Sequence, residues 1–298
     1  MTGADRHSRR QRLQLAQREA AVIDKSAGLP VTVATITQGL ERGGVGAGDV
    51  LEVHSSMASM GWVCGGEQAV IEALMALVTV DGTITMPAHS TQLSDPATWR
   101  RPTIPGAWVD RVRAELPAWD RALTPTRWMG RVAEMFRLLP GVVRSDHPHS
   151  SLAAWGRHAA DICARHPLTQ SLGDESPMAR LYDLDAKVVL IGVGQENNTA
   201  LHLSESRATW LGKSDFRAGA PMMVEGRREW VEFDDLEFDS SDFAEVGRAF
   251  DQQTRLIRHT RIGTAPVQVM PMRALVDFGV TWMEANRPWL QTGHDGHE

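Results

Sequence analysis

The sequence predicts an α/β fold that contains at least one pair of parallel strands. Two runs of β-forming residues, Val50–His54 and Thr83–Met86, lie on either side of a helical pattern at Gly66–Val78, and strand, helix, strand is the order of a parallel pair. A third run, Lys187–Val193, is apolar without interruption, as central parallel strands tend to be. The chain has 298 residues, 42% of them hydrophobic, so it is long enough to bury a substantial core.

The elements before the first strand are a polar lead-in and one helix. Residues 1–28 are rich in arginine and are expected to be helical or disordered, outside a single domain at 29–285. From Thr32 the pattern is amphipathic and predicts a helix that ends near Gly43-Gly44. The turn-rich residues 46–49 then lead into the first strand.

The segment after the second strand, residues 87–127, has six prolines and three tryptophans. Proline interrupts helices and strands, so regular structure is not expected in this segment. Long loops inside compact domains are usually functional or disordered, and the aromatic content favours an ordered one. We therefore expect a substrate-facing insertion.

The last third of the chain predicts further helices and one hairpin. Residues 194–199 offer N-cap side chains before a helix that is expected at 200–211. The later elements expected are a hairpin-like segment at 221–224 and 229–233 around Gly226, a helix near 243–257, a helix near 272–284 and a polar tail at 286–298.

The composition excludes several classes of protein. The formal net charge is −6, whereas nucleic-acid binding depends on Lys and Arg that neutralise phosphates. No apolar run reaches the ~18 residues of a membrane span, and the first 25 residues lack the apolar core of a secretory signal. The two cysteines, Cys64 and Cys163, suit a reducing compartment. We expect a cytoplasmic protein, monomer or homodimer, without a nucleic-acid or membrane partner.

One acidic segment sets the sign of the net charge. Between Glu229 and Glu245 there are eight acidic residues and no Lys or Arg, so the rest of the chain carries a formal charge of about +2. Such a segment is either a solvated face or a trap for a cationic, polyamine-like ligand.

The helix expected after the third strand carries a histidine and a carboxylate on one face. His202 and Glu205 are three residues apart, and a carboxylate beside an imidazole can fix its tautomer and raise its basicity. A histidine in a helix is often structural, but ligands gather at the carboxyl ends of strands in such folds. His202 is therefore either a structural residue or a general base.

The first strand ends in His54-Ser55-Ser56, followed by Ser59, Gly61 and Gly65-Gly66. Small and hydroxyl residues there either bring backbone N–H groups close to a phosphate or only cap a turn. A Walker or G-x-G-x-x-G pattern is absent. Histidines such as His147 and His149 invite a metal interpretation, but without H-E-x-x-H or paired histidines at i, i+4 no metal is expected.

Six motifs occur in order along the chain: VHSSMASMGW at 53–62, DGTITMP at 81–87, DPAT at 95–98, RSDHP at 144–148 with Ser150, ESP at 175–177, and VLIGVG at 189–194 continuing into NTALHLSE at 198–205. In this order the chain resembles the aminoglycoside 3-N-acetyltransferases, antibiotic N-acetyltransferases unrelated to the common GNAT enzymes. The resemblance covers roughly residues 30–275.

The resemblance implies a three-layer α/β/α sandwich with a mixed, largely parallel sheet and a small additional β-containing lobe. It implies acetyl-CoA as donor and an aminoglycoside as acceptor. His202 would act with an acidic residue of the acidic segment, best matched by Asp235 or Glu237, beside Glu205 on its own helix. The residues expected at CoA are His54, Ser55, Ser56, Ser59, Gly61, Trp62, Val63, Ser145, His147, Ser150 and Ser151. Those expected at the drug are Asp95, Glu175, Asp235 and Glu237.

The implied reaction is direct transfer of the acetyl group. His202 would accept a proton from the drug amine, which then attacks the thioester without an acyl-enzyme intermediate. Two other interpretations are a binding protein that sequesters cationic drugs and a metal-dependent amide hydrolase.

Overall fold

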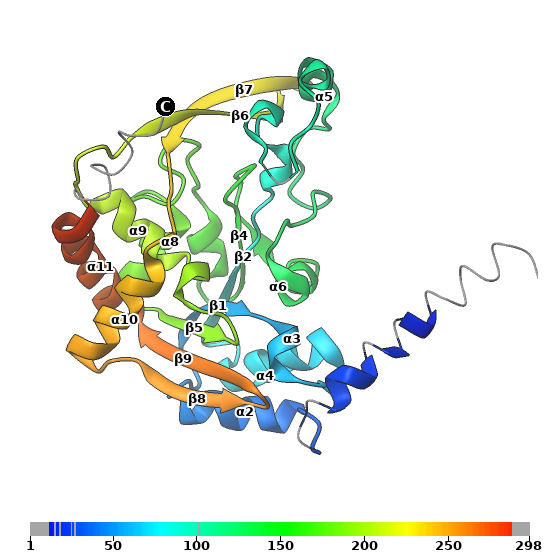
Figure 1. Ribbon diagram of the computed structural model, residues 1–298, viewed down its shortest axis with the longest axis vertical. Helices are drawn as coiled ribbons and strands as arrows, with labels where there is room; N and C mark the ends of the chain where they lie inside the picture. The colour runs from blue at the N-terminus through cyan, green and yellow to red at the C-terminus, as the bar shows by residue number, and fades with distance from the viewer. Residues whose placement is uncertain are drawn as a thin grey trace, which may run out of the picture.

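The computed structural model describes residues 12–14, 16–17, 19–24, 26, 28–100 and 102–287. Their main element is a sheet of seven strands in the order β3-β4-β2-β1-β5-β9-β8 (Figure 1). Strand β1 (Val50–Ser55) lies between β2 (Thr83–Pro87) and β5 (Lys187–Ile191) and is parallel to both. The predicted α/β class and the predicted parallel pair are therefore confirmed.

The outer strands run antiparallel to their neighbours. Strand β4 (Leu152–Gly156) pairs with β2 and with β3 (Val143–Arg144), while β9 (Ala265–Pro271) pairs with β5 and with β8 (Arg258–Ile262). The sheet is mixed, as expected, but the expectation that it is largely parallel is wrong, because four of these six pairs are antiparallel. The turn Gly263-Thr264 joins β8 directly to β9, whereas a parallel neighbour needs a crossover of about a dozen residues.

Helices pack on both faces of the sheet, and each face has its own apolar cluster. On one face lie α2 (Val33–Arg42), α3 (Met57–Met60), α4 (Gly66–Val78) and α6 (Gly130–Phe136). On the other lie α7 (Ala159–Cys163), α8 (Pro177–Asp183), α9 (Ala200–Arg207), α10 (Phe243–Thr254) and α11 (Met272–Asn286). Because strand side chains alternate, Leu51 and Val53 of β1 enter the first cluster, whereas Glu52 and His54 point to the second face.

Local chemistry sets several helix boundaries. Helix α2 starts after Thr32, whose Oγ1 accepts the backbone N–H of Thr35 at 3.2 Å. Helix α9 ends at Arg207, earlier than the predicted 211, because Ala208 is extended. Helix α10 ends at Thr254 rather than near 257, since Arg255 has the left-handed φ of 58°.

The 87–127 segment contains more regular structure than the sequence predicts. Its short 3-10 turns are η1 (Thr91–Leu93), η2 (Pro96–Thr98) and η3 (Gly106–Trp108). Helix α5 (Val109–Glu115) follows, and the expectation of no regular structure is wrong there because α5 occupies a stretch without proline.

A separate two-stranded sheet crosses over one end of the molecule, with α5 near its tip (Figure 1). Its strands β6 (Asp215–Val224) and β7 (Arg227–Leu236) confirm the predicted hairpin and extend it. The turn residues Glu225 and Gly226 both have positive φ, 47° and 78°, as in the two-residue turns that match strand twist. The hairpin holds the 87–127 segment, because the Arg228 Nε donates to the Leu116 carbonyl at 3.0 Å.

The two ends of the chain are described in part. Of the lead-in, the described residues between 12 and 24 are helical, and the remaining residues up to 11 lie outside the described part. Helix α11 extends into the expected polar tail, since it ends at Asn286, and the next residue, Arg287, is only 4% exposed. Residues 288–298 lie outside the described part. Within the described ranges, none of the helices combines the length and the apolar character needed to cross a bilayer.

Candidate active site

Three histidines lie at the sheet edge where the parallel strands β1, β2 and β5 have their carboxyl ends. His54 is the fifth residue of β1, and His89 follows β2 by two residues. His202 lies in the first turn of α9, which follows β5 through the 3-10 turn η4 (Gln195–Asn197). All three histidines line one cleft of about 680 Å³. This is the edge at which open α/β sheets bind ligands.

The imidazole of His202 is paired with a carboxylate of its own helix. Glu205 Oε2 lies 2.5 Å from His202 Nδ1, and Glu205 is fully buried while 19% of the His202 side chain is exposed. Since a carboxylate ion only accepts hydrogen bonds, Nδ1 carries the proton and Nε2 is the basic nitrogen. Phe238 and Phe243 pack against the ring, with centroids at 4.9 and 4.8 Å. The ring is thus fixed in the form that a general base requires.

Glu205 is held from behind by Arg287, the residue after α11. Arg287 Nη1 donates to Glu205 Oε1 at 2.6 Å, and the backbone N–H of Asp239 donates to the same oxygen at 3.0 Å. Arg287 also donates to both oxygens of Asp242, at 2.9 and 2.8 Å. Burial works to lower the pKa of Arg287, but the carboxylates of Asp242 and Glu205 outweigh burial and raise that pKa. No feature of the sequence pattern marked Arg287.

A second contact between a histidine and a carboxylate lies inside the sheet. Glu52 and His54 share a face of β1, and the fully buried carboxylate of Glu52 contacts His54 Nε2. The contact is close enough for an ion pair but lacks hydrogen-bond geometry, and both Glu52 oxygens have no donor among the described residues. The backbone N of Thr199 lies 3.3 Å from the same Nε2. Sequence reasoning missed Glu52, although an acid inside an apolar strand, two residues before a histidine, is a usable signal.

His89 is kept neutral in the cleft. Burial is the main reason that the pKa of His89 is lowered, to about 3, and electrostatic repulsion by neighbouring basic groups, Arg144 among them, adds to it. Its Nε2 is buried, with no hydrogen-bond partner among the residues that the structure describes. His89 therefore shapes the cleft without adding charge to it at neutral pH.

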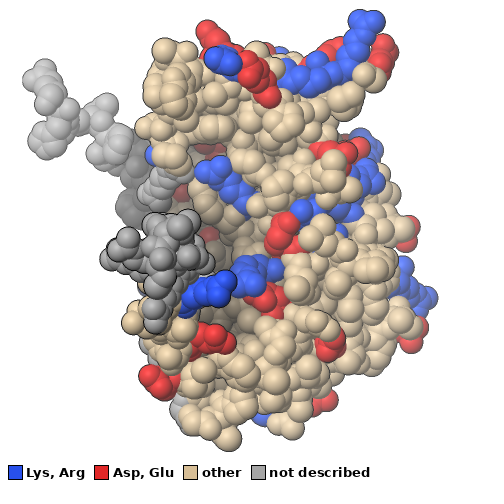
Figure 2. Space-filling model, turned by 90° about the vertical axis from the view of Figure 1, so that its right-hand side faces the viewer, with Lys and Arg blue, Asp and Glu red and all other residues tan. Residues whose placement is uncertain are grey.

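The far wall of the cleft ends in an exposed aromatic rim. Trp128 is 72% exposed and has a left-handed φ of 61°, and Gly130 at the start of α6 has a φ of 82°. The Arg127 guanidinium lies 4.4 Å from the Trp128 ring centroid. Trp128 also lines a neighbouring hollow of about 280 Å³ together with Trp99. On the face in Figure 2, which carries α5 and α6, Lys and Arg side chains border the hollowed middle.

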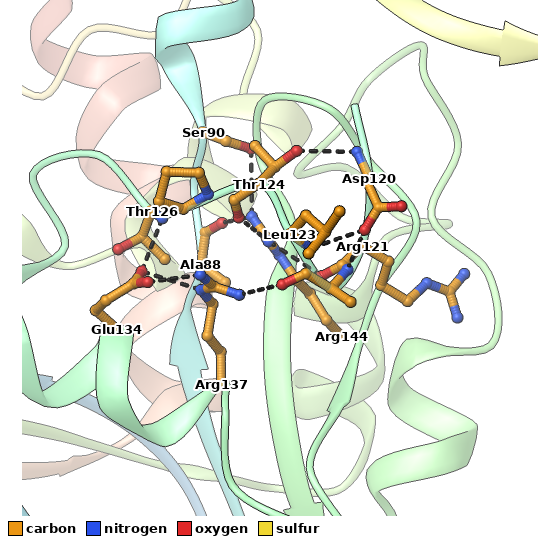
Figure 3. A network of polar contacts seen from close by, with 12 residues as sticks. Ala88, Ser90, Asp120, Arg121, Leu123, Thr124, Thr126, Glu134, Arg137 and Arg144 are labelled. Atoms are coloured by element: carbon orange, nitrogen blue, oxygen red, sulfur yellow. Dashed lines mark hydrogen bonds and ion pairs between the residues drawn. The ribbon is translucent and has the colours of Figure 1, made fainter. Parts of the chain in front are cut away.

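A buried arginine fixes the strand end that precedes His89 (Figure 3). Arg144 is 4% exposed and donates to the carbonyls of Ala88 and Thr124, each at 2.6 Å, and to Ser151 Oγ at 2.9 Å. Burial is the main reason that the pKa of Arg144 is lowered, to about 10. Ser151, expected at CoA, thus belongs to the support of the cleft.

Other residues expected at CoA lie in a buried cluster of histidines. His166 Nε2 is 2.7 Å from the Ser171 carbonyl and Nδ1 is 2.8 Å from Ser145 Oγ. A carbonyl only accepts, so Nε2 carries the proton. Burial lowers the pKa of His166 and His149 to about 4 and that of His147 well below its usual value. The candidates outside the cleft lining are Ser145, His147, Ser150 and Ser151.

The motif after β1 divides in two. His54, Ser55 and Ser56 line the cleft. Ser59 instead donates to the Gly192 carbonyl at 2.8 Å, and the candidates Gly61, Trp62 and Val63 also lie outside the lining. The Ser56 N–H donates to the Ile191 carbonyl at 2.9 Å, so this amide is not free for a phosphate.

The acids that the resemblance implies as partners of His202 have other contacts. Both oxygens of Asp235 accept hydrogen bonds from Ser171, from its N–H at 2.9 Å and its hydroxyl at 2.7 Å, and burial raises the pKa of Asp235. Glu237 is exposed, with Oε2 3.3 Å from Ser214 Oγ. At His202 Nδ1 the structure has Glu205, and the expected role of Asp235 or Glu237 as the acidic partner stays a prediction.

The other acids expected at the drug are engaged by arginines. Both oxygens of Asp95 lie 2.9 Å from Arg113 Nη2. Glu175 lies 2.5 Å from Arg165, and both side chains are exposed. Glu237 lines a pocket of about 410 Å³ with Asp239 and with Phe238, whose ring packs against His202. Across the described residues, no three His, Cys, Asp or Glu side chains are grouped as metal ligands.

The fold and the cleft together define an α/β protein with a cleft of small-molecule size at the carboxyl edge of its parallel strands. A family model described as Aminoglycoside 3-N-acetyltransferase matches residues 53–284. The chain belongs to this family, the resemblance inferred from the six motifs is confirmed, and the protein is an acyltransferase.

Relatives with similar sequence and structure support the assignment to this family. Aminoglycoside N(3)-acetyltransferase VIII of Streptomyces fradiae is 37% identical over 283 residues, which cover 90% of this chain and 96% of that protein. The crystal structure of YokD from Bacillus subtilis is 40% identical, with a TM-score of 0.84 over 87% of this chain and 95% of that one. AAC-IIIb, solved as a binary complex with CoASH, is 27% identical, with a TM-score of 0.77 over 86% and 97%.

Proposed function

We propose that the protein transfers the acetyl group of acetyl-CoA to the 3-amino group of a 2-deoxystreptamine aminoglycoside, with His202 as general base. The observation that carries this proposal is the buried Glu205 carboxylate on His202 Nδ1, which leaves Nε2 at a cleft of about 680 Å³. That volume is in the range of small-molecule sites. The names of the relatives and the CoASH complex of AAC-IIIb support the two substrates.

The chemistry needs one proton transfer before the attack. The drug amine is largely protonated near neutral pH, and His202 Nε2 removes a proton from it. The amine nitrogen then forms a bond to the thioester carbon, and the C–S bond breaks when the tetrahedral intermediate collapses. As the amide forms, the nitrogen of the tetrahedral intermediate releases its second proton to solvent. The CoA thiolate leaves and takes up the proton held by His202, while Glu205 stabilises the imidazolium until then. Direct transfer needs no cysteine, and burial raises the pKa of the Cys163 thiol to about 12, which suppresses its thiolate.

The two substrates approach His202 from different sides. His54, Ser55 and Ser56 form one wall of the cleft, and we assign CoA to this side. The drug is cationic and belongs on the side of the exposed acids Glu237 and Asp239, which flank the His202 contact Phe238. Ammonium groups are favoured beside such carboxylates.

The same proposal extends to the layers of the fold, the limits of the domain and the location of the protein. Apolar clusters on both sheet faces support a three-layer α/β/α sandwich, and the β6–β7 sheet supports a small β-containing lobe. The domain of 29–285 is extended to Arg287, whose buried contacts tie it to the core. Two free cysteines, Cys64 and Cys163, support a cytoplasmic location, as monomer or homodimer.

The test is thiol release from acetyl-CoA in the presence of a panel of aminoglycosides, with the modified nitrogen located by NMR. We expect release only when drug is present, and acetylation at N3. His202→Ala should lower kcat by about 10²–10⁴ with a modest change in CoA affinity. His259→Ala, at an exposed histidine of β8, is the matched control.

Two outcomes would contradict this proposal. Drug binding without thiol release would favour a sequestering protein. Near-normal turnover of His202→Ala would remove the general base from the mechanism.

A further inference from the structure

A chain of buried charges runs from His202 to the end of α11. Glu205 joins His202 to Arg287, and Asp242, the N-cap of α10, binds the other edge of the guanidinium. Glu205, Arg287 and Asp242 are 0%, 4% and 7% exposed. Arg287 lies beyond the residues 53–284 matched by the family model. The contact therefore completes the His202 site from outside the matched region.

The geometry of Arg287 fixes the direction of the Glu205 carboxylate. Nη1 donates to Glu205, Nε and Nη2 donate to Asp242, and Nη2 also donates to the Asp239 carbonyl at 2.9 Å. The Trp210 ring centroid lies 4.6 Å from the guanidinium carbon. A planar guanidinium that is itself hydrogen-bonded on several sides fixes the orientation of a carboxylate better than a single ammonium group does.

The charge of Arg287 matters as much as its shape. Behind His202, two carboxylates and one guanidinium leave a net charge of about −1, which would become about −2 without Arg287. An added negative charge makes the His202–Glu205 pair hold a proton more tightly, whichever residue carries it. A pair that already holds its proton cannot accept one from an amine.

We propose that Arg287 is a positioning residue for acetyl transfer: it holds Glu205 against His202 and offsets the carboxylate charge so that His202 stays free to accept a proton. This rests on the proposed function, because it takes His202 as the base.

Charged and titratable groups face the pair from every element around it. On the cleft side these are His54, His89 and Glu196. On the far side they are Lys213, Asp239, Asp242 and Arg287, and Asp215 and Glu284 act in turn on Lys213. Variants at Arg287 and Asp242 leave the other groups unchanged, so the effects of those groups cancel in a comparison.

Two neutral variants should shift the pH profile in opposite directions. Arg287→Met removes a positive charge, so the acidic limb of the plot of kcat/KM against pH should shift to higher pH by about one unit. Asp242→Asn removes a negative charge, so the same limb should shift to lower pH. Arg287→Lys keeps the charge and should restore the limb to near its wild-type position, with a lower kcat because the fork is lost.

The experiment measures kcat/KM from pH 5.5 to 9 with acetyl-CoA and kanamycin for the full chain and each variant. An NMR titration of the His202 imidazole without substrates, assigned by comparison with His202→Gln, gives the same information independently of turnover. Arg273→Met, at the opposite end of α11 with its guanidinium on the Tyr182 and Asp183 carbonyls, is the control.

Opposite pH shifts of Arg287→Met and Asp242→Asn support the inference, because a general loosening of the structure would not shift the profiles of the two variants in opposite directions. Unchanged profiles, or shifts in the same direction, overturn it. If Arg287→Met does not fold, Asp242→Asn still decides, and the absence of a downward shift there overturns the inference. If wild-type protein releases no thiol with any drug, the proposed function fails, and the NMR titration alone then decides the role of Arg287.

Discussion

The buried histidine cluster makes the folded state sensitive to acid. His147 and His166 have ring centroids 4.7 Å apart, with His149 beside them, and the pKa of His149 and of His166 is lowered to about 4, chiefly by burial. In the unfolded chain a histidine titrates at about 6.5. Between these values the unfolded state binds more protons than the folded state, so the free energy of unfolding falls as the pH falls from about 6.5 to 4.

The loss can be worked out for His149 and His166. With a folded pKa of about 4 and an unfolded pKa of about 6.5, each loses about 1.3 kcal/mol of stability between pH 7.5 and 5.5. Together they lose about 2.7 kcal/mol, a large part of the ~5–15 kcal/mol typical of a folded protein. His147, whose pKa is also lowered, adds to this loss.

The assay is urea unfolding at pH 7.5, 6.5 and 5.5, followed by the fluorescence of the ten tryptophans. In His166→Gln the amide N–H can still donate to the Ser171 carbonyl, but the titrating group is gone. Its change in unfolding free energy between pH 7.5 and 5.5 should be smaller than that of wild type by about 1.3 kcal/mol. His259→Gln, at an exposed position, should match wild type. An identical pH dependence of His166→Gln and wild type would refute the reasoning.

Three further predictions concern other parts of the chain. Arg144→Met removes the donor to the buried Thr124 carbonyl and one of the two donors to the Ala88 carbonyl, and should lower the free energy of unfolding in urea by about 2–5 kcal/mol. Gly192→Ala places a Cβ 2.4 Å from the Ser59 Cβ at a φ of 67° and should cost about 1–3 kcal/mol in the same assay. Gly46→Ala, with open space around it, should cost little, and an equal cost for both glycine variants would contradict the packing argument. Cys64→Ser should leave kcat unchanged, because direct transfer needs no thiol nucleophile, and a large loss would indicate an acyl-enzyme.

The centre of the sheet could be predicted from the sequence, but its edges could not. Strands β1, β2 and β5 are apolar runs with turn residues at their ends, and burial on both faces requires such runs. Strand β3 is two residues long, and β4 reads LAAWG, with few β-formers. Strand β8, RHTRI, is a polar edge strand. Their pairing depends on neighbours distant in the sequence, which a local pattern does not contain.

The candidate site, too, could be predicted from the sequence only in its local contacts. His202 and Glu205 are neighbours on one helix face, so their contact could be read from the spacing. The contact of Thr199 with His54 spans 145 residues and that of Glu205 with Arg287 spans 82. The surroundings of Asp235 could not be read from the sequence, because the face on which a strand residue lies depends on the register of the hairpin, and its partner Ser171 is 64 residues away.

The contact between Glu205 and Arg287 also determines when the His202 site can form during synthesis of the chain. Glu205 is translated 82 residues before its arginine, an interval of about 4–16 s at about 5–20 residues per second. During that time the carboxylate has to stay hydrated or protonated, because burying it without Arg287 would leave an unbalanced charge. The β1–β2–β5 core can form earlier, but the His202 site waits for α11 to dock. Catalytic competence is thus expected to arise late, as one of the last steps of folding after the ribosome has released the end of α11.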